Sequence, residues 1–137
     1  MVKPGYWIEF YEMDIQTLRA GPLYTRLTDA FTEELKELGL NARIASRFKH
    51  LLEDEPLFTE VTEEIRYPGI GEWNGKIGGI MIDNMAQFYM KLFPRLIKQL
   101  GIRTEEVEDL WKEIKQEFKE YQTCLQYHRI YAKKTII

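Results

Sequence analysis

The sequence predicts one α/β domain, and three observations support this prediction. Segments rich in β-branched and aromatic residues alternate with segments whose apolar residues recur every three or four positions. Apolar residues make up 45% of the 137 residues and charged residues 30%, a balance typical of globular chains. The predicted order is strand, helix, helix, strand, two long helices, strand, without an internal repeat or a linker, so residues 1–137 form a single domain.

The first predicted strand covers residues 6–13 and is unusual because it is apolar at both odd and even positions. Side chains of successive strand residues point to opposite faces, so such a strand is typical of the inside of a sheet that is covered on both sides. The residues concerned are Trp7, Ile8, Phe10, Tyr11 and Met13.

Two helices and a second strand follow. Gly21-Pro22 begins the first helix, and Gly39 suits its C-cap. Ser46 is the expected N-cap of a shorter helix, and residues 59–67 alternate as a half-exposed strand that Pro68 ends. The apolar stripe of the first helix comprises Tyr24, Leu27, Phe31, Leu35 and Leu38, that of the second Phe48, Leu51 and Leu52, and the inner face of the strand Val61, Ile65 and Tyr67.

The second half contains two long helices and a last strand. A loop with five glycines, residues 68–79, leads into a helix that Pro94 is expected to kink or divide and that Gly101 ends. Thr104 is the expected cap of the next helix, and residues 127–133 form the last strand. The two helical stripes are Ile77, Met81, Met85, Phe88, Leu92 and Leu96, and then Val107, Trp111, Ile114, Phe118 and Tyr121.

Charge and cysteine content exclude several classes of protein. A net charge of −3 argues against an electrostatic nucleic-acid binder, and the short apolar runs predict no membrane helix. The N-terminal residues lack the pattern of a signal peptide. The single cysteine, Cys124, rules out an internal disulfide and a multi-cysteine zinc site, so we expect a cytoplasmic or nuclear protein.

Two motifs that could carry chemistry are weak. Gly71–Ile77 departs from the phosphate-loop pattern because three residues, not four, separate its glycines and no hydroxyl follows Lys76. Cys124 and His128 would lie about 13 Å apart on one strand face, too far for a nucleophile pair without a bend. We expect His128 to be a hydrogen-bonded core or edge histidine.

Carboxylates around the first strand are stronger candidates. Glu9, Glu12 and Asp14 cluster around this strand. A carboxylate at the C-terminal end of a central strand lies where α/β sheets bind ligands, although a solvated strand end would carry the same residues. Met81, Met85 and Tyr89 on the long helix could line a ligand pocket, but such a stripe is more often part of a core.

The order of these segments resembles the C-terminal half of class I S-adenosylmethionine-dependent methyltransferases. Residues 2–9, VKPGYWIE, are similar to the segment that leads into the family's fifth strand, although Tyr6 replaces a glycine. Residues 44–52 resemble the helix before strand six, residues 59–68 strand six and residues 127–133 strand seven. The long helical stretch between the last two strands is similar to the fungal branch that includes regulators of secondary metabolism.

The resemblance implies a partial Rossmann-like fold with a mixed sheet, in which strand seven lies antiparallel between strands five and six. Residues 69–121 would be a helical insertion that covers the sheet's ligand end. The family's glycine-rich cofactor loop and its ribose-binding acid precede the segment resembled here. We therefore expect S-adenosylmethionine in the complete enzyme, but no cofactor binding and no activity in this truncated chain alone.

The resemblance also implies a site for the methyl acceptor, and two other hypotheses stay open beside it. Residues expected to contact the unknown methyl acceptor are Glu12, Asp14, Met81, Met85 and Tyr89, with no catalytic, cofactor or metal residue assigned. A second hypothesis is a non-catalytic interaction protein that self-associates, or pairs with a full-length relative, through its exposed first strand. A truncated reading of a longer enzyme is a third.

Overall fold

The computed structural model describes residues 2–136 of an α/β chain, so residues 1 and 137 of the predicted domain lie outside the described part. The predicted order of elements is confirmed. The strands are β1 (Trp7–Leu18), β2 (Phe58–Arg66) and β3 (Cys124–Lys134), and the α-helices are α1 (Pro22–Glu37), α2 (Phe48–Glu53), α3 (Gly75–Leu100) and α4 (Val107–Glu120).

The last strand is the central one. The sheet order is β1-β3-β2, and β3 is antiparallel to both neighbours. Leu18 pairs with Cys124 and Arg66 with Tyr127, so the C-terminal ends of β1 and β2 lie together at the start of β3. The expected position of the last strand is confirmed, but the expected mixed sheet is wrong because both pairings among the described strands are antiparallel.

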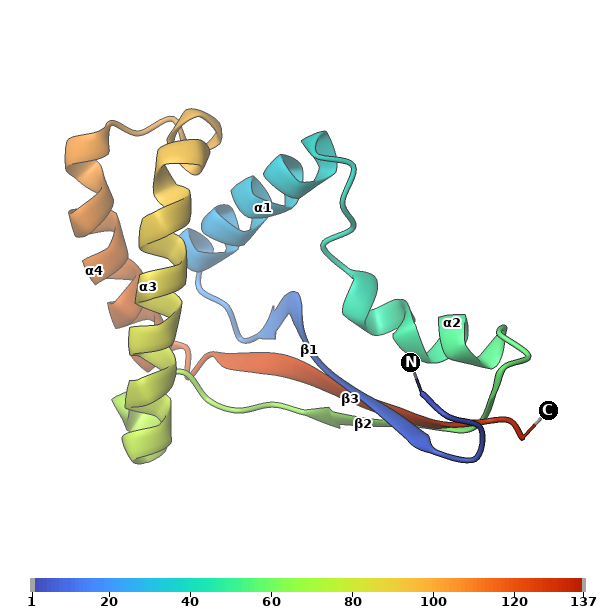
Figure 1. Ribbon diagram of the computed structural model, residues 1–137. Helices are drawn as coiled ribbons and strands as arrows, with labels where there is room; N and C mark the ends of the chain where they lie inside the picture. The colour runs from blue at the N-terminus through green and yellow to red at the C-terminus, as the bar shows by residue number, and fades with distance from the viewer. Residues whose placement is uncertain (1, 137) are drawn as a thin grey trace.

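The helices lie in two groups around this sheet (Figure 1). Helices α1, α3 and α4 gather at the end where β3 begins, whereas α2 lies over one face toward the other end. The face under α2 is held by the stacked rings of Phe10 and Phe48, whose centroids are 5.2 Å apart. The structure therefore has a helical body at the C-terminal ends of β1 and β2.

The opposite face of the sheet is open to solvent within residues 2–136. Trp7 and Tyr11 point away from α2 and are 50% and 55% exposed. They contact aromatic neighbours on β3: Tyr11 stacks on Tyr127 at 5.0 Å, and Trp7 lies 5.9 Å from Tyr131. The prediction of an inner strand covered on both sides is wrong for β1, which is an edge strand with one open face.

The helical body contains the larger apolar core. The predicted stripe of α4 is confirmed, because Val107, Trp111, Ile114 and Phe118 are buried, although Tyr121 is exposed. Tyr24 of α1 packs edge-on against Phe118 with centroids 4.7 Å apart. These contacts join α1 to α4.

The stripe predicted for α3 has the wrong rotation about the helix axis. Phe88 is 41% exposed and Ile77 is also exposed, whereas Tyr89, one position further, is 2% exposed. The buried side of α3 comprises Gly78, Met85, Tyr89, Phe93, Leu96 and Leu100. The helix also runs through Pro94 without being divided, and it ends at Gly101 in the left-handed conformation, as expected.

Several predicted helix ends differ in detail. The Ser46 hydroxyl donates to the Arg43 carbonyl (2.8 Å) within a 3₁₀ turn, so Ser46 does not cap α2, and Leu51 is exposed rather than packed. Arg103, not Thr104, precedes the turn before α4, and its N–H donates to the Glu106 carboxylate at 2.7 Å.

The start of α1 is capped by a distant side chain. The buried Glu117 carboxylate of α4 accepts hydrogen bonds from the backbone N–H groups of Leu23 (2.8 Å) and Tyr24 (2.9 Å). A Cβ at Gly21 would collide with this carboxylate, so the glycine allows the close approach. Glu117 therefore satisfies N–H groups that Pro22 and Gly21 cannot cap with their own side chains.

Candidate functional site

A buried histidine lies between carboxylates from both neighbouring strands. His128 of β3 is almost fully buried. Its Nε2 lies 3.6 Å from Asp14 Oδ2 on β1, and its Nδ1 lies 3.3 Å from Glu63 Oε2 on β2. Because β3 is the central strand, the side chains of Asp14, His128 and Glu63 form a row of carboxylate, imidazole and carboxylate across the sheet. The expectation that His128 is a hydrogen-bonded histidine of the sheet is confirmed.

Hydrogen bonds within the row define the role of each imidazole nitrogen. The Gln126 side-chain amide nitrogen lies 3.0 Å from His128 Nε2, which fits an N–H donated to an unprotonated Nε2. In that tautomer His128 Nδ1–H donates to Glu63. At 3.6 Å, Asp14 Oδ2 is beyond hydrogen-bond distance of Nε2, so the imidazole does not satisfy it.

Asp14 is the most constrained carboxylate of the row. Its side chain has no solvent exposure, and Oδ1 accepts hydrogen bonds from Arg43 Nε (2.8 Å) and the Gln16 N–H (2.9 Å). Oδ2 is buried and has no hydrogen-bond partner among the described residues. An unsatisfied buried oxygen costs free energy, so Asp14 is the strained polar group of the row.

A cavity of about 180 Å³ adjoins Asp14 under α1. Two phenols share this cavity with the carboxylate, those of Tyr24 and Tyr89. Burial raises the pKa of Tyr89 to about 12 and raises the pKa of Tyr24 well above its ordinary value, with Tyr89 adding to the latter shift. Both phenols are therefore protonated at neutral pH. The remaining walls are largely apolar and include Met13, Phe31, Leu35, Ile44 and Leu125.

The structure brings together two of the five residues expected to contact an acceptor. Asp14 and Tyr89 line the same cavity. Glu12 is exposed on β1 opposite His128 in the strand register and does not line it. Met85 is buried in the helical core and Met81 packs against that core, so neither methionine reaches the cavity.

Three further residues were missed from the sequence. Tyr24 appeared only as a packing residue, and Arg43 carried no signal because its contact with Asp14 is made by a loop. Glu63, in contrast, did carry a signal in the sequence. It falls between Val61 and Ile65 in the alternation, on the side predicted to be apolar, and an acid there indicates a buried polar contact.

Within residues 2–136, Cys124 does not form a pair with His128. Cys124 is buried, and its sulfur accepts from Arg19 Nη2 at 3.2 Å rather than contacting His128. Within residues 2–136, no group of three or more His, Cys, Asp or Glu residues is arranged to hold a metal ion.

The glycine-rich loop closes on itself between Gly71 and Gly78. The Gly71 N–H donates to the Gly78 carbonyl at 3.0 Å, and the Gly71 carbonyl occupies the place that a Cβ of Gly78 would take. Trp73 and Asn74 fill the space around Gly69. The Gly71 N–H is therefore engaged within the loop.

No protein-family model and no curated protein matches the chain. The functional proposal therefore rests on the residues described above and on their geometry. None of the helices within residues 2–136 combines the length and apolar character needed to cross a membrane.

Proposed function

We propose that this chain is the substrate-side half of an S-adenosylmethionine-dependent methyltransferase and binds the methyl acceptor of the complete enzyme. The observation that supports the proposal best is the strand arrangement. A last strand lies antiparallel between two strands whose C-terminal ends meet beside a cavity. The resembled family has the same arrangement in its fifth, seventh and sixth strands, and binds ligands at that end of the sheet.

In this proposal Asp14 orients the acceptor. The acceptor lies in the cavity against Asp14, while Arg43 and the Gln16 N–H hold the carboxylate in place through Oδ1. The protonated phenols of Tyr24 and Tyr89 line the same cavity, and the apolar wall excludes water. Fixing the acceptor in this way supplies the positioning on which methyl transfer depends.

The methyl donor is held elsewhere in this proposal. The family's cofactor loop and ribose-binding acid precede the segment resembled here, and residues 69–79 pack on themselves. The isolated chain should therefore give no specific heat on titration with S-adenosylmethionine. A dissociation constant of about 10 μM or lower would contradict the proposal that the methyl donor is held outside this chain.

Activity of the native assembly tests the proposal. The polypeptide or complex that contains this chain, isolated from its own cells with an antibody to it, should transfer tritiated methyl groups from S-adenosylmethionine to an extract of those cells. Asp14→Asn should lower the transfer rate by about 10- to 100-fold because it misplaces the acceptor. The exposed Asp109→Asn is the matched control and should leave the rate unchanged. Absence of transfer, or an Asp14→Asn rate equal to the control, would refute the proposal.

A non-catalytic interaction protein is the second candidate, and the sheet favours it. β1 has a free edge, and its open face carries the exposed Trp7 and Tyr11. Free edges and exposed aromatic faces are typical of surfaces that pair with another chain. In this alternative the chain pairs with a second copy, or with a full-length relative, through β1.

A further inference from the structure

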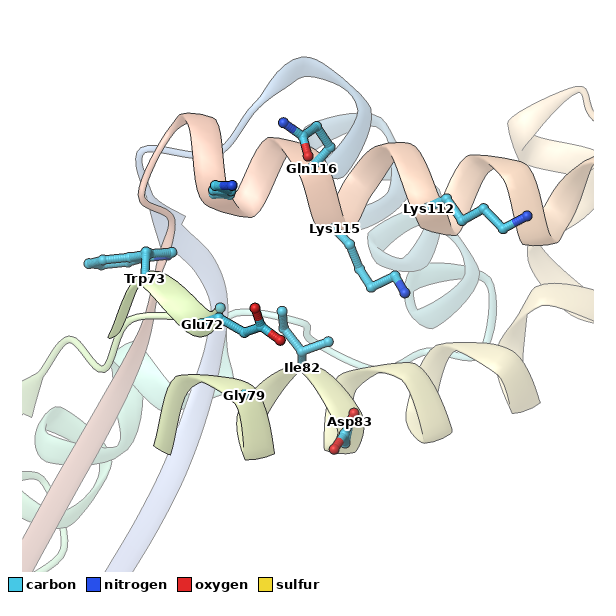
Figure 2. A pocket seen from close by; sticks show the side chains of 10 residues that line it. Glu72, Trp73, Gly79, Ile82, Asp83, Lys112, Lys115 and Gln116 are labelled. Carbon is cyan, nitrogen blue, oxygen red and sulfur yellow. The ribbon is translucent and has the colours of Figure 1, made fainter. Parts of the chain in front are cut away.

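A larger groove lies outside the Asp14 cavity, between α4 and the first turns of α3 with the loop before them (Figure 2). Its volume is about 730 Å³, which falls in the range of small-molecule sites. It belongs to the helical segment 69–121 and shares no lining residue with the Asp14 cavity. An inference about it therefore does not depend on the proposed methyltransferase function.

One wall of the groove is a row of lysines. Lys112, Lys115 and Lys119 of α4 follow the three- and four-residue spacing that places side chains on one face of a helix. The row extends over about 10 Å of helix axis. Lys112 lies 3.4 Å from Asp109, but neither Lys115 nor Lys119 has a carboxylate within 4.0 Å in the described part of the chain. Lys115 and Lys119 therefore carry positive charge without an ion-pair partner among the described residues, and Figure 2 shows Lys115 reaching from α4 toward α3.

The opposite wall presents a fixed indole and apolar surface. The Trp73 indole N–H donates to the Ile70 carbonyl at 2.6 Å. The ring packs so closely on two glycines that a Cβ at Gly69 or Gly71 would lie 2.6 or 2.8 Å from it. Ile82 of α3 adds a second apolar side chain to this wall, with Glu72 between it and Trp73 in Figure 2. The aromatic contact is thus formed before any ligand arrives.

Two acids and a glycine restrict what fits. Glu72 and Asp83 lie on the α3 side, and no basic group is within 4.0 Å of either in residues 2–136. They repel a second anionic group, so a ligand would place its negative charge at the lysines and an uncharged part beside Ile82. A Cβ at Gly79 would meet no atom within 4 Å, so this glycine leaves open space in the groove.

We propose that this groove binds a small organic anion with a flat aromatic body. The phosphate or carboxylate of the ligand contacts Lys115 and Lys119, and its ring lies against Ile82 and Trp73. Charge at one end and apolar surface at the other make the site selective for anions that carry a ring over simple inorganic anions.

Calorimetric titration of the full chain with 1-naphthyl phosphate tests this site. 1-Naphthoate is the second probe and distinguishes phosphate from carboxylate, while 1-naphthol and inorganic phosphate are the controls for ring and charge alone. At least one aromatic anion should bind at about 1 mM or below, and both controls should bind about tenfold more weakly. Equal binding of 1-naphthol, or no binding of either aromatic anion, would overturn the proposal.

Variants locate the binding in the groove. Lys115→Gln with Lys119→Gln should weaken the aromatic anion about tenfold, whereas Lys36→Gln with Lys98→Gln removes the same charge elsewhere and should have no effect. Gly79→Leu should also abolish binding because its side chain fills the groove while all three lysines remain. Its helical position and open surroundings favour a folded variant, which a circular dichroism spectrum confirms. Unchanged affinity in both groove variants would refute the assignment.

Discussion

Tyr89 has the clearest energetic role that the structure assigns. Its ring lies at the centre of the helical body, with centroids 5.9 Å from Trp111, 6.2 Å from Tyr24 and 6.4 Å from Phe93. Only 2% of its surface is exposed. The sequence pattern instead predicted Leu92 on the packing stripe and Tyr89 outside it. The pattern therefore predicts the larger loss of stability for Leu92→Ala, whereas the structure predicts it for Tyr89→Ala.

The expected costs follow from burial. Truncating a fully buried aromatic side chain to alanine costs about 3–5 kcal/mol, so Tyr89→Ala should lower the free energy of unfolding by that amount. Leu92 is only partly buried, and Leu92→Ala should cost about 1–2 kcal/mol. Tyr89→Phe keeps the ring and removes a hydroxyl at the Asp14 cavity, so its cost should be about 1 kcal/mol or less.

Urea unfolding followed by fluorescence measures all three variants. With a denaturant slope of about 1.5–2 kcal/mol per M, Tyr89→Ala should lower the midpoint by roughly 2 M. A domain of this size has about 5–15 kcal/mol of stability, so the variant should be weakened but measurable at low temperature. If Tyr89→Ala cost no more than Leu92→Ala, the packing described for α3 would be wrong.

Three further outcomes are expected. Glu117→Gln keeps only one of the two carboxylate oxygens that cap α1, so it should lower the free energy of unfolding by about 1–2 kcal/mol; no loss would contradict the capping role. Because burial raises the pKa of Tyr89 from 10.0 to about 12, its stabilising contribution is complete below pH 10 and lost as pH rises toward 12. Tyr89→Phe should therefore lose less stability than the wild type between pH 10 and 12, and parallel losses would exclude this effect. Sedimentation at several concentrations should show self-association through β1 that Tyr11→Lys reduces, whereas a monomer at every concentration would refute it.

Local sequence patterns predicted the helices and strands better than they predicted which side of each helix is buried. α4 was predicted with its buried side because its apolar residues form one narrow stripe between charged residues. α3 carries apolar residues on several sides, including the exposed Ile77, Ile80 and Phe88, so spacing alone fits more than one rotation. Only the tertiary contacts with α1 and α4 select Tyr89 and Phe93.

The candidate site was predictable only in part for a related reason. Asp14 was identified because it directly follows the predicted strand 6–13, but β1 continues to Leu18, so the carboxylate lies within the strand beside its register shift. Its neighbours depend on pairing between distant segments. Strand register brings His128 opposite Ile65 and beside Glu63, and a one-residue slip would send these side chains to the other face. Arg43 joins through a loop whose path no periodicity describes.

Mapping the cofactor on the native assembly tests the central claim most directly. The polypeptide or complex that contains this chain would be irradiated with tritiated S-adenosylmethionine, and the labelled peptides identified by mass spectrometry, with excess unlabelled cofactor as the competition control. The proposed division of the enzyme predicts competable label in the assembly, all of it outside residues 2–136. Label inside these residues, or no competable label in the assembly, would contradict the claim that this chain is the acceptor-binding half of a methyltransferase.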